Sequence, residues 1–426
     1  MENGPLDSAD QPTLLTQPPL QQLPDDLLRH IFHRLPTNPS AHAFVSMAHK
    51  EWRRLVHDEE NFLRYFRREH HSVPPLLGLI CDAYHGDLHF KSTPTTGNAV
   101  NLMLPTLAHE GGFHAYGCTH GRVLLYSPWV PSHHGELMVW DPLTGEQNII
   151  PPAPGFLVGQ SYGAALVCDA DHAHGGDCHS SPFRIVFAYS QYDSCRRWGP
   201  PPIHVFARVY SSKTGSWDGR VAAIMDPEFH FGCKPSAVAG NATAVYWMSQ
   251  AETKVVEFHL ETQKLLLIDT PEVTRGLHFF LAPARDGRLR LAGAIDNFIV
   301  LFSWDEGAWV SHTLVWLGDF LRLHVYAQHE NDGEELLDVA EYSDDEDEEE
   351  LLYATIKSPV IGFSEQLDCI FLQEQGVFMI SLESGQHQQV FEPGQHFSGP
   401  VYPYSTFYTA ERRRQRGVTS CDIIAI

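Results

Sequence analysis

The stretch Leu23-Pro-Asp-Asp-Leu-Leu-Arg-His-Ile-Phe-His-Arg-Leu-Pro36 determines the first part of the fold. Pro24 suits the first turn of a helix, and Asp25 and Asp26 complement the positive end of the helix dipole. Apolar residues then recur at helical spacing until Pro36 interrupts the run; they are Leu27, Leu28, Ile31, Phe32 and Leu35. The stretch therefore predicts an amphipathic helix that ends at Pro36.

Two further helices are expected directly after this one. The pattern from Pro39 to Met47 predicts a helix that buries Ala43, Phe44 and Met47, and the run from Lys50 to Val56 predicts a helix with an apolar face. A short amphipathic segment over residues 61–68 follows before prolines end the helical character. Residues 23–70 are therefore predicted to form a small three-helix bundle.

Beyond Pro75 the apolar period changes from 3.6 toward 2, which is typical of strands. A pattern of strand, tight turn and strand recurs at five places: 139–146, 209–217, 256–264, 301–309 and 380–386. The spacing favours a β-propeller of six or seven degenerate blades over residues 75–410, since a pair of β-sandwiches would leave residues over. The predicted fold class is multidomain, α plus all-β.

Four segments are predicted to lie outside the packed core. Residues 1–22 are rich in Pro, Gln and Asp and predict a disordered leader, and residues 411–426 form a C-terminal tail. The histidine-rich stretch 169–181 and the acidic stretch 331–350 predict exposed loops. The acidic stretch lacks the spacing of a calcium loop, and its role stays open.

The charge and cysteine content limit the possible partners and compartments. The chain has 426 residues and a formal charge of -24, from 53 acidic against 29 basic residues, which disfavours nucleic acid and anionic membranes. Its eight cysteines form no Cys-x-x-Cys pair, and no apolar run reaches the roughly 20 residues that span a bilayer. We expect a soluble protein with reduced thiols, in the cytoplasm, the nucleus or both.

Motifs of catalysis are missing from the sequence. It has no nucleophile elbow, Walker A loop, zinc-protease helix or dinucleotide fingerprint, so we predict no enzymatic activity and no cofactor. The loop 169–181 does hold potential metal ligands, namely Asp171, His172, His174, Cys178 and His179. Gly175 and Gly176 and the lack of a second ligand pair favour a flexible loop, so no metal site is predicted.

The N-terminal stretch, with Trp52-Arg-Arg-Leu-Val56 and Asp58, resembles the F-box over about residues 23–68. One departure is Met47-Ala48-His49, where that family usually has Val-Cys. The segments 244–248 and 255–262 are similar to a blade of the kelch-like, F-box-associated propellers common in plant F-box proteins.

This resemblance implies the substrate-recognition subunit of a ubiquitin ligase. An F-box binds a Skp-type adaptor, which leads to a cullin and a RING subunit, while the β domain holds the target protein. The residues that match the adaptor face are Leu23, Pro24, Leu27, Ile31, Leu35, Trp52 and Leu55. A bundle this small leaves apolar residues unburied, which agrees with a partner surface, although the same residues could form only its core.

Two alternatives stay open, and the target-binding residues are not predicted. One is a propeller enzyme, a hydrolase or sugar oxidase, with the helices as an accessory module. The other is an F-box scaffold that does not lead to ubiquitination.

Overall fold

A computed structural model covers the chain, and it describes most residues between 23 and 407. The residues left out within that range are 38, 71–72, 83–87, 94–112, 128–135, 158–159, 173–175, 193–202, 220, 226–228, 233–234, 240–241, 285, 296–297, 317–359, 375, 395–396 and 398. The leader 1–22, the acidic stretch 331–350 and the tail 411–426 therefore lie outside the described residues.

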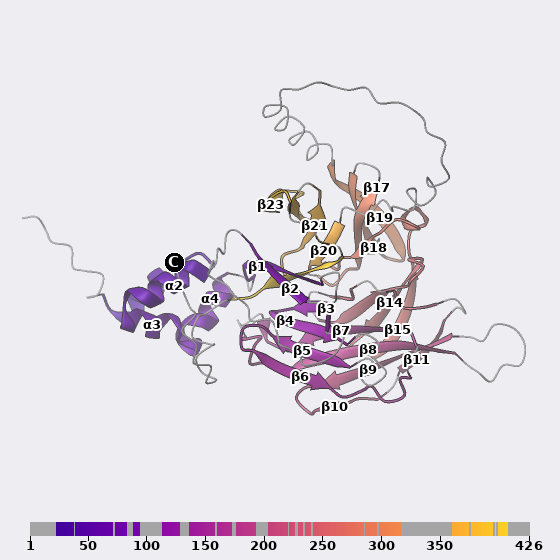
Figure 1. Cartoon of the computed structure of the whole chain (residues 1–426), viewed down its shortest axis with the longest axis horizontal. Coiled ribbons are helices and arrows are strands. Elements are labelled where there is room, and N and C mark those ends of the chain that lie inside the picture. The colour runs from indigo at the N-terminus through magenta and orange to yellow at the C-terminus, as the bar shows by residue number, and fades with distance from the viewer. Residues whose placement is uncertain are drawn as a thin grey trace, which may run out of the picture.

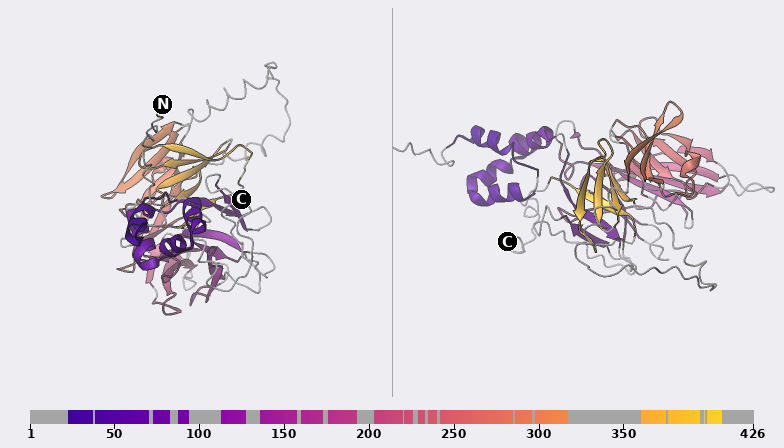
Figure 2. Two further views of the ribbon diagram at one scale, coloured as in Figure 1. Left: turned by 90° about the vertical axis from the view of Figure 1, so that its left-hand side faces the viewer. Right: turned by 90° about the horizontal axis from the view of Figure 1, so that it is seen from above.

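The N-terminal region contains four α-helices rather than the predicted three. They are α1 (Asp25–Phe32), α2 (Pro39–Ala48), α3 (Lys50–Val56) and α4 (Arg64–Glu69), and a π-helical turn, η2 (Glu59–Leu63), leads into α4. The predicted segment 61–68 thus becomes part of a π turn and a separate helix. These helices form a bundle at one side of the β domain (Figure 1, Figure 2).

Helix α1 ends earlier than predicted. Its last residue is Phe32, and the amides of Arg34 and Leu35 bond back only three residues, to Ile31 and Phe32, at 3.1 Å each. The residue before a proline avoids helical geometry, so Leu35 cannot continue the helix. The chain between Phe32 and Pro36 therefore forms a tighter turn.

Seven side chains form the core of the bundle: Leu28, Phe32, Leu55, Val56, Phe62, Leu63 and Phe66. The predicted burial of Phe44 is wrong, because 61% of that residue is exposed. Helix α2 turns His42 and Ser46 inward instead, and Phe44, two positions from each, lies on the other side. The side chains of Ala43 and Met47 are outside the described set.

The β domain is a six-bladed propeller. Its first blade combines β1 (Leu76–Asp82), β2 (Leu88–Ser92) and β24 (Val401–Ser405). The second blade consists of β3 (His114–Thr119), β4 (Arg122–Tyr126), β5 (Leu137–Asp141) and β6 (Glu146–Ile150). The third blade consists of β7 (Tyr162–Cys168), β8 (Phe183–Tyr192), β9 (Ile203–Ser211), β10 (Ser216–Trp217) and β11 (Val221–Met225).

Each of the last three blades has four strands. The strands are β12 (Ala237–Val238), β13 (Ala244–Met248), β14 (Lys254–His259) and β15 (Lys264–Asp269); β16 (Phe280–Leu281), β17 (Arg290–Ile295), β18 (Phe298–Asp305) and β19 (Ala308–Trp316); and β20 (Val360–Ser364), β21 (Cys369–Gln373), β22 (Val377–Ser381) and β23 (His387–Phe391). A 3-10 turn, η5 (Glu272–Thr274), lies between β15 and β16. All described pairings within the blades are antiparallel.

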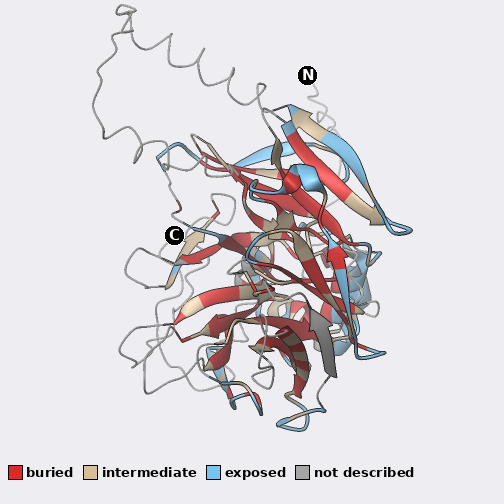
Figure 3. Ribbon diagram, turned by 90° about the vertical axis from the view of Figure 1, so that its right-hand side faces the viewer, coloured by how far each residue is buried: buried red, intermediate tan, exposed pale blue. Residues whose placement is uncertain are grey.

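The six blades close into a ring through six buried apolar clusters. Each cluster is shared by two successive blades, and the last joins β20–β23 to the blade of β1 and β24. Strand β24 is the inner strand of that first blade, where Leu79 pairs with Pro403 and Ile80 with Tyr402. Buried residues therefore follow most of the strands in the described part of the ring, whereas the outer strands β15 and β19 are largely exposed (Figure 3).

The five recurring turns predicted from the sequence are confirmed as hairpins. Each falls between the third and fourth strands of one blade: β5–β6, β9–β10, β14–β15, β18–β19 and β22–β23. The first blade supplied no such signal, and its described residues form three strands, without a fourth strand that could make this hairpin. Blade number, predicted as six or seven, is six.

Candidate functional site

Helix α1 presents an apolar stripe to solvent, made of Pro24, Leu27 and Ile31. Leu27 is 46% exposed and Ile31 39% exposed, and Pro24 is exposed as well. Positions three and four apart lie on one helix face, so the three side chains form a continuous surface. Leu28 and Phe32, one position further on in each case, point into the core, which fixes the stripe outward.

The other predicted adaptor residues support this stripe from within the bundle. Leu23, Leu35 and Trp52 are half-buried and pack against the core, with the Trp52 ring edge-to-face on Phe32 at 5.5 Å. Leu55 is only 1% exposed. Trp52, Leu55 and Val56 share a face of α3, and that face is turned inward, so Leu55 supports the surface rather than forming part of it.

One ion pair joins α1 to α3, and a second lies within α1. Arg54 donates from Nη2 to Oδ2 of Asp25 over 2.9 Å, and Arg29 donates from Nη1 to Oδ1 of Asp26 over 2.9 Å. Both pairs are solvent-exposed and contribute little stability, about 0–1 kcal/mol each. Their main effect is to set charged groups around the apolar stripe.

A histidine is buried in the bundle without a hydrogen bond. His42 is 6% exposed, and neither ring nitrogen has a partner. Its ring lies edge-to-face on Phe66, with 4.5 Å between centroids. Burial lowers the pKa of His42 to about 4, and the nearby His57 and His70 add to the shift. The sequence did not mark His42, because its partners come from other elements.

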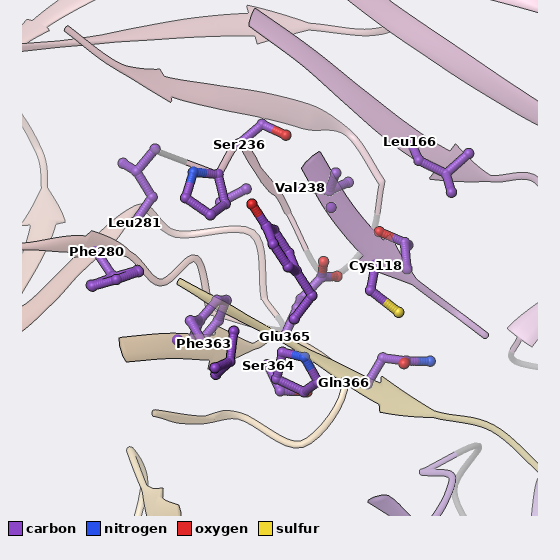
Figure 4. Close-up of a pocket in the computed structure, with 18 residues that line it drawn as sticks. Cys118, Leu166, Ser236, Val238, Phe280, Leu281, Phe363, Ser364, Glu365 and Gln366 are labelled. Carbon is purple, nitrogen blue, oxygen red and sulfur yellow. The ribbon is translucent and has the colours of Figure 1, made fainter. Parts of the chain in front are cut away.

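The axial channel of the propeller is the place where an enzyme of this fold would hold its chemistry. A cavity of about 70 Å³ lies there, and residues of all six inner strands, β3, β7, β12, β16, β20 and β24, line it. Figure 4 shows this lining, in which small and apolar side chains such as Val238 and Leu281 prevail. Burial raises the pKa of the Cys118 thiol there to about 12, so it is a poor nucleophile.

The described part of the histidine-rich stretch is a loop in which Asp169, Asp171 and Ser180 are exposed, as predicted, but one of its histidines is buried, contrary to the prediction. His179 is buried: its Nδ1–H donates to Oδ2 of Asp141 over 2.6 Å, and its Nε2 lies 2.6 Å from Oγ1 of Thr406. Burial alone would raise the pKa of Asp141, but His179 and two backbone amides lower it. His174 lies outside the described residues.

This Asp141–His179–Thr406 chain has the order of a nucleophile-activating triad, but all three side chains are buried. Asp141 ends β5, His179 follows β7, and Thr406 follows β24, so the chain joins three successive blades. We assign it a structural role at the closure of the ring.

Comparisons with known proteins identify the helical bundle. Residues 20–64, about a tenth of the chain, match the F-box domain. No curated protein matches the chain at a significant level. In the described part of the chain, no helix combines the length and apolar character needed to cross a bilayer.

Two solved structures show a distant likeness to the chain. The β-propeller domain of Cps50 (Swd1) from Myceliophteria thermophila is 10% identical with a TM-score of 0.37, over 77% of this chain and 87% of that chain. A 6-phosphogluconolactonase candidate from Bacteroides uniformis is 11% identical with a TM-score of 0.35, over 75% of this chain and 97% of that chain. Likenesses this weak carry no argument about function.

Proposed function

We propose that this protein is the substrate-recognition subunit of an SCF-type (Skp–cullin–F-box) E3 ubiquitin ligase. The observation that carries the proposal is the F-box match over residues 20–64 on a bundle that exposes an apolar stripe. F-box domains generally bind Skp-type adaptors, and the stripe is the kind of surface that a partner helix or groove covers.

The adaptor contact would centre on Pro24, Leu27 and Ile31. Complete burial of an aliphatic side chain stabilises a complex by about 1.5–3 kcal/mol, so Leu27 and Ile31 would be the main contributors. Leu23, Leu35 and Trp52 would form the margin of the contact, and Leu55 would hold the surface in shape from beneath. This division of roles refines the face expected from the sequence.

The propeller would hold the target protein, in the manner of the plant-type, kelch-like F-box-associated domains that residues 244–248 and 255–262 resemble. The first segment is β13, and the second runs from β14 into the turn before β15; β13 and β14 are the middle strands of the fourth blade. The chain itself would make no bonds. It would act in the cytoplasm, the nucleus or both, by holding target and loaded ligase together at high effective concentration.

Reconstitution with purified components tests this function. The full chain is mixed with a Skp-type adaptor, a cullin and a RING subunit and separated by size-exclusion chromatography. We expect the chain to co-elute with the ligase, and the double variant Leu27→Asp, Ile31→Asp to elute alone. Elution of the intact chain on its own contradicts the proposal, and co-elution without ubiquitin transfer favours the scaffold alternative.

A further inference from the structure

Three potential metal ligands meet at the seam between the helical bundle and the propeller. They are His120, His172 and Cys178, each of which offers one nitrogen or sulfur atom, and these atoms all lie within 4.8 Å of one another. His120 sits on the two-residue turn between β3 and β4, while the other two lie in the connection between β7 and β8. The cluster thus joins two neighbouring blades.

A fourth donor lies beside them. Cys168 ends β7 and is 8% exposed, and its thiol lies near the Cys178 thiol and the His172 ring. Sγ of Cys178 lies 3.4 Å from Nε2 of His172. Two thiols and two imidazoles therefore share one partly buried place.

The backbone around the cluster is well fixed. Gly176 donates to the carbonyl of Asp171 over 2.7 Å, and an added Cβ at Gly176 would lie 2.8 Å from that oxygen, so the chain approaches itself closely there. Nη2 of Arg122 donates to the carbonyls of His179 and Ser181 over 2.8 Å each. These bonds anchor the connection on the adjacent blade.

The orientation of His120 is also set. His120 has a φ of 50° and Gly121 a φ of 77°, as a two-residue hairpin turn requires, which places the imidazole at the tip of the hairpin. The Gln366 side-chain amide lies 2.6 Å from Nδ1 of His120. The amide atom at this distance is the nitrogen Nε2 of Gln366, which donates to Nδ1 and holds the ring in place, so Nε2 of His120 would give up its proton on binding a metal.

We propose that His120, His172, Cys168 and Cys178 form a zinc site with two thiolate and two imidazole ligands. Zinc prefers this donor set in a tetrahedral arrangement, with bonds of about 2.3 Å to sulfur and about 2.0 Å to nitrogen. Such bonds separate the ligand atoms by about 3.3–3.8 Å. The donor atoms of His120, His172 and Cys178, which lie within 4.8 Å of one another, would draw together around the ion, and the Cys168 side chain would turn to complete the set. Two thiolates balance the charge of the ion.

The position of the site gives it a structural consequence. A small cavity beside the cluster is lined by His120, His172 and Cys178 and by Arg67 of α4 and Phe407. Phe407 in turn lies edge-to-face on Phe66 of the bundle core, with 6.2 Å between centroids. A metal here would stiffen the surface against which α4 docks, and so set the direction in which the bundle leaves the propeller. This inference does not depend on the proposed ligase function.

Metal content of the purified full chain tests the proposal. After expression in zinc-supplemented medium, elemental analysis should find one zinc per chain, and Cys178→Ser and His120→Ala should each lower this at least tenfold. Cys118→Ser, a thiol in the axial channel, and His89→Ala, an exposed histidine on β2, are matched controls and should keep the metal.

A second readout keeps the test independent of folding defects in the variants. The unaltered chain, stripped with a chelator and titrated with cobalt(II), should show thiolate-to-cobalt charge-transfer absorption that zinc abolishes. Absence of zinc from the intact chain together with no cobalt spectrum overturns the proposal. Zinc that persists in both cluster variants overturns it as well, as does a Cys168–Cys178 disulfide in the chain purified under reducing conditions.

Discussion

The helical bundle and the propeller differ in where they leave apolar side chains. The bundle exposes Leu27, Ile31, Phe44 and Tyr65 within a few dozen residues, whereas the propeller shares its buried clusters between blades all around the ring. Several of the large apolar residues that the propeller does expose, such as Leu266 and Val310, lie on outer strands. The propeller buries most of its apolar side chains by closing into a ring, whereas the bundle leaves an apolar surface that another protein can cover.

The largest expected effect comes from opening the ring. A chain truncated after Gly399 lacks β24, the inner strand of the first blade, and leaves its partner β1 with an unpaired edge. We expect this chain to aggregate, whereas a chain truncated after Phe407 should stay folded. Circular dichroism and light scattering measure the difference, and a monomeric, folded chain without β24 would contradict closure by this strand.

A second prediction concerns the buried network that joins three blades. Asp141→Ala removes the acceptor of His179 and of the Leu143 and Thr144 amides, which lie 2.9 and 3.1 Å from Oδ1. Buried donors left unpaired in this way lower the free energy of unfolding by about 3 kcal/mol. Urea unfolding followed by tryptophan fluorescence checks this value.

Asp305 offers a matched control for that network. It ends β18 as Asp141 ends β5, at the same hairpin position of another blade, but it is exposed. Asp305→Ala should change the free energy of unfolding by less than about 0.5 kcal/mol. An equal loss of the free energy of unfolding in both variants would show that the aspartate stabilises the protein through its hairpin position and not through the buried network.

The bundle, in contrast, should respond to pH through His42. The ordinary pKa is 6.5 and the folded value is about 4, so the unfolded chain binds more protons between these values. The free energy of unfolding should therefore fall as pH falls through this range, by about 2 kcal/mol between pH 7 and pH 5.

Calorimetric unfolding of the full chain and of His42→Leu at the two pH values measures this contribution. The variant should lose about 2 kcal/mol of the pH dependence, while His30→Leu, at an exposed position of α1, should retain it. An unchanged pH dependence in His42→Leu would assign the effect to other groups.

The smallest expected effect is on stability at the apolar stripe. Leu27→Asp and Ile31→Asp place charges at exposed positions, so each should change the free energy of unfolding by less than about 0.5 kcal/mol. Leu28→Asp, its buried neighbour, should unfold the bundle. Thermal unfolding of the three variants tests this contrast, and a large loss at Leu27 would mean that the stripe belongs to the core.

Local patterns predicted the elements well, and contacts between distant elements were not predictable. Lys50–Val56 was expected as a helix and is one, because its apolar period and flanking residues are local signals. Whether Leu55 points inward depends on how α3 packs against α1 and η2, and the apolar spacing within α3 does not reveal that packing. In the same way His120 and Cys178 are brought together by the packing of two blades, which no spacing in the sequence reveals.

Calorimetric titration of the full chain with a purified Skp-type adaptor tests the central claim most directly. The intact chain should bind, and Leu27→Asp with Ile31→Asp should weaken binding at least about 30-fold, since two central apolar contacts are worth 2 kcal/mol or more. The matched double variant Leu266→Asp, Val310→Asp puts the same charges at equally exposed positions of the propeller and should bind like the intact chain. No binding by the intact chain, or equal loss in both variants, would contradict the account.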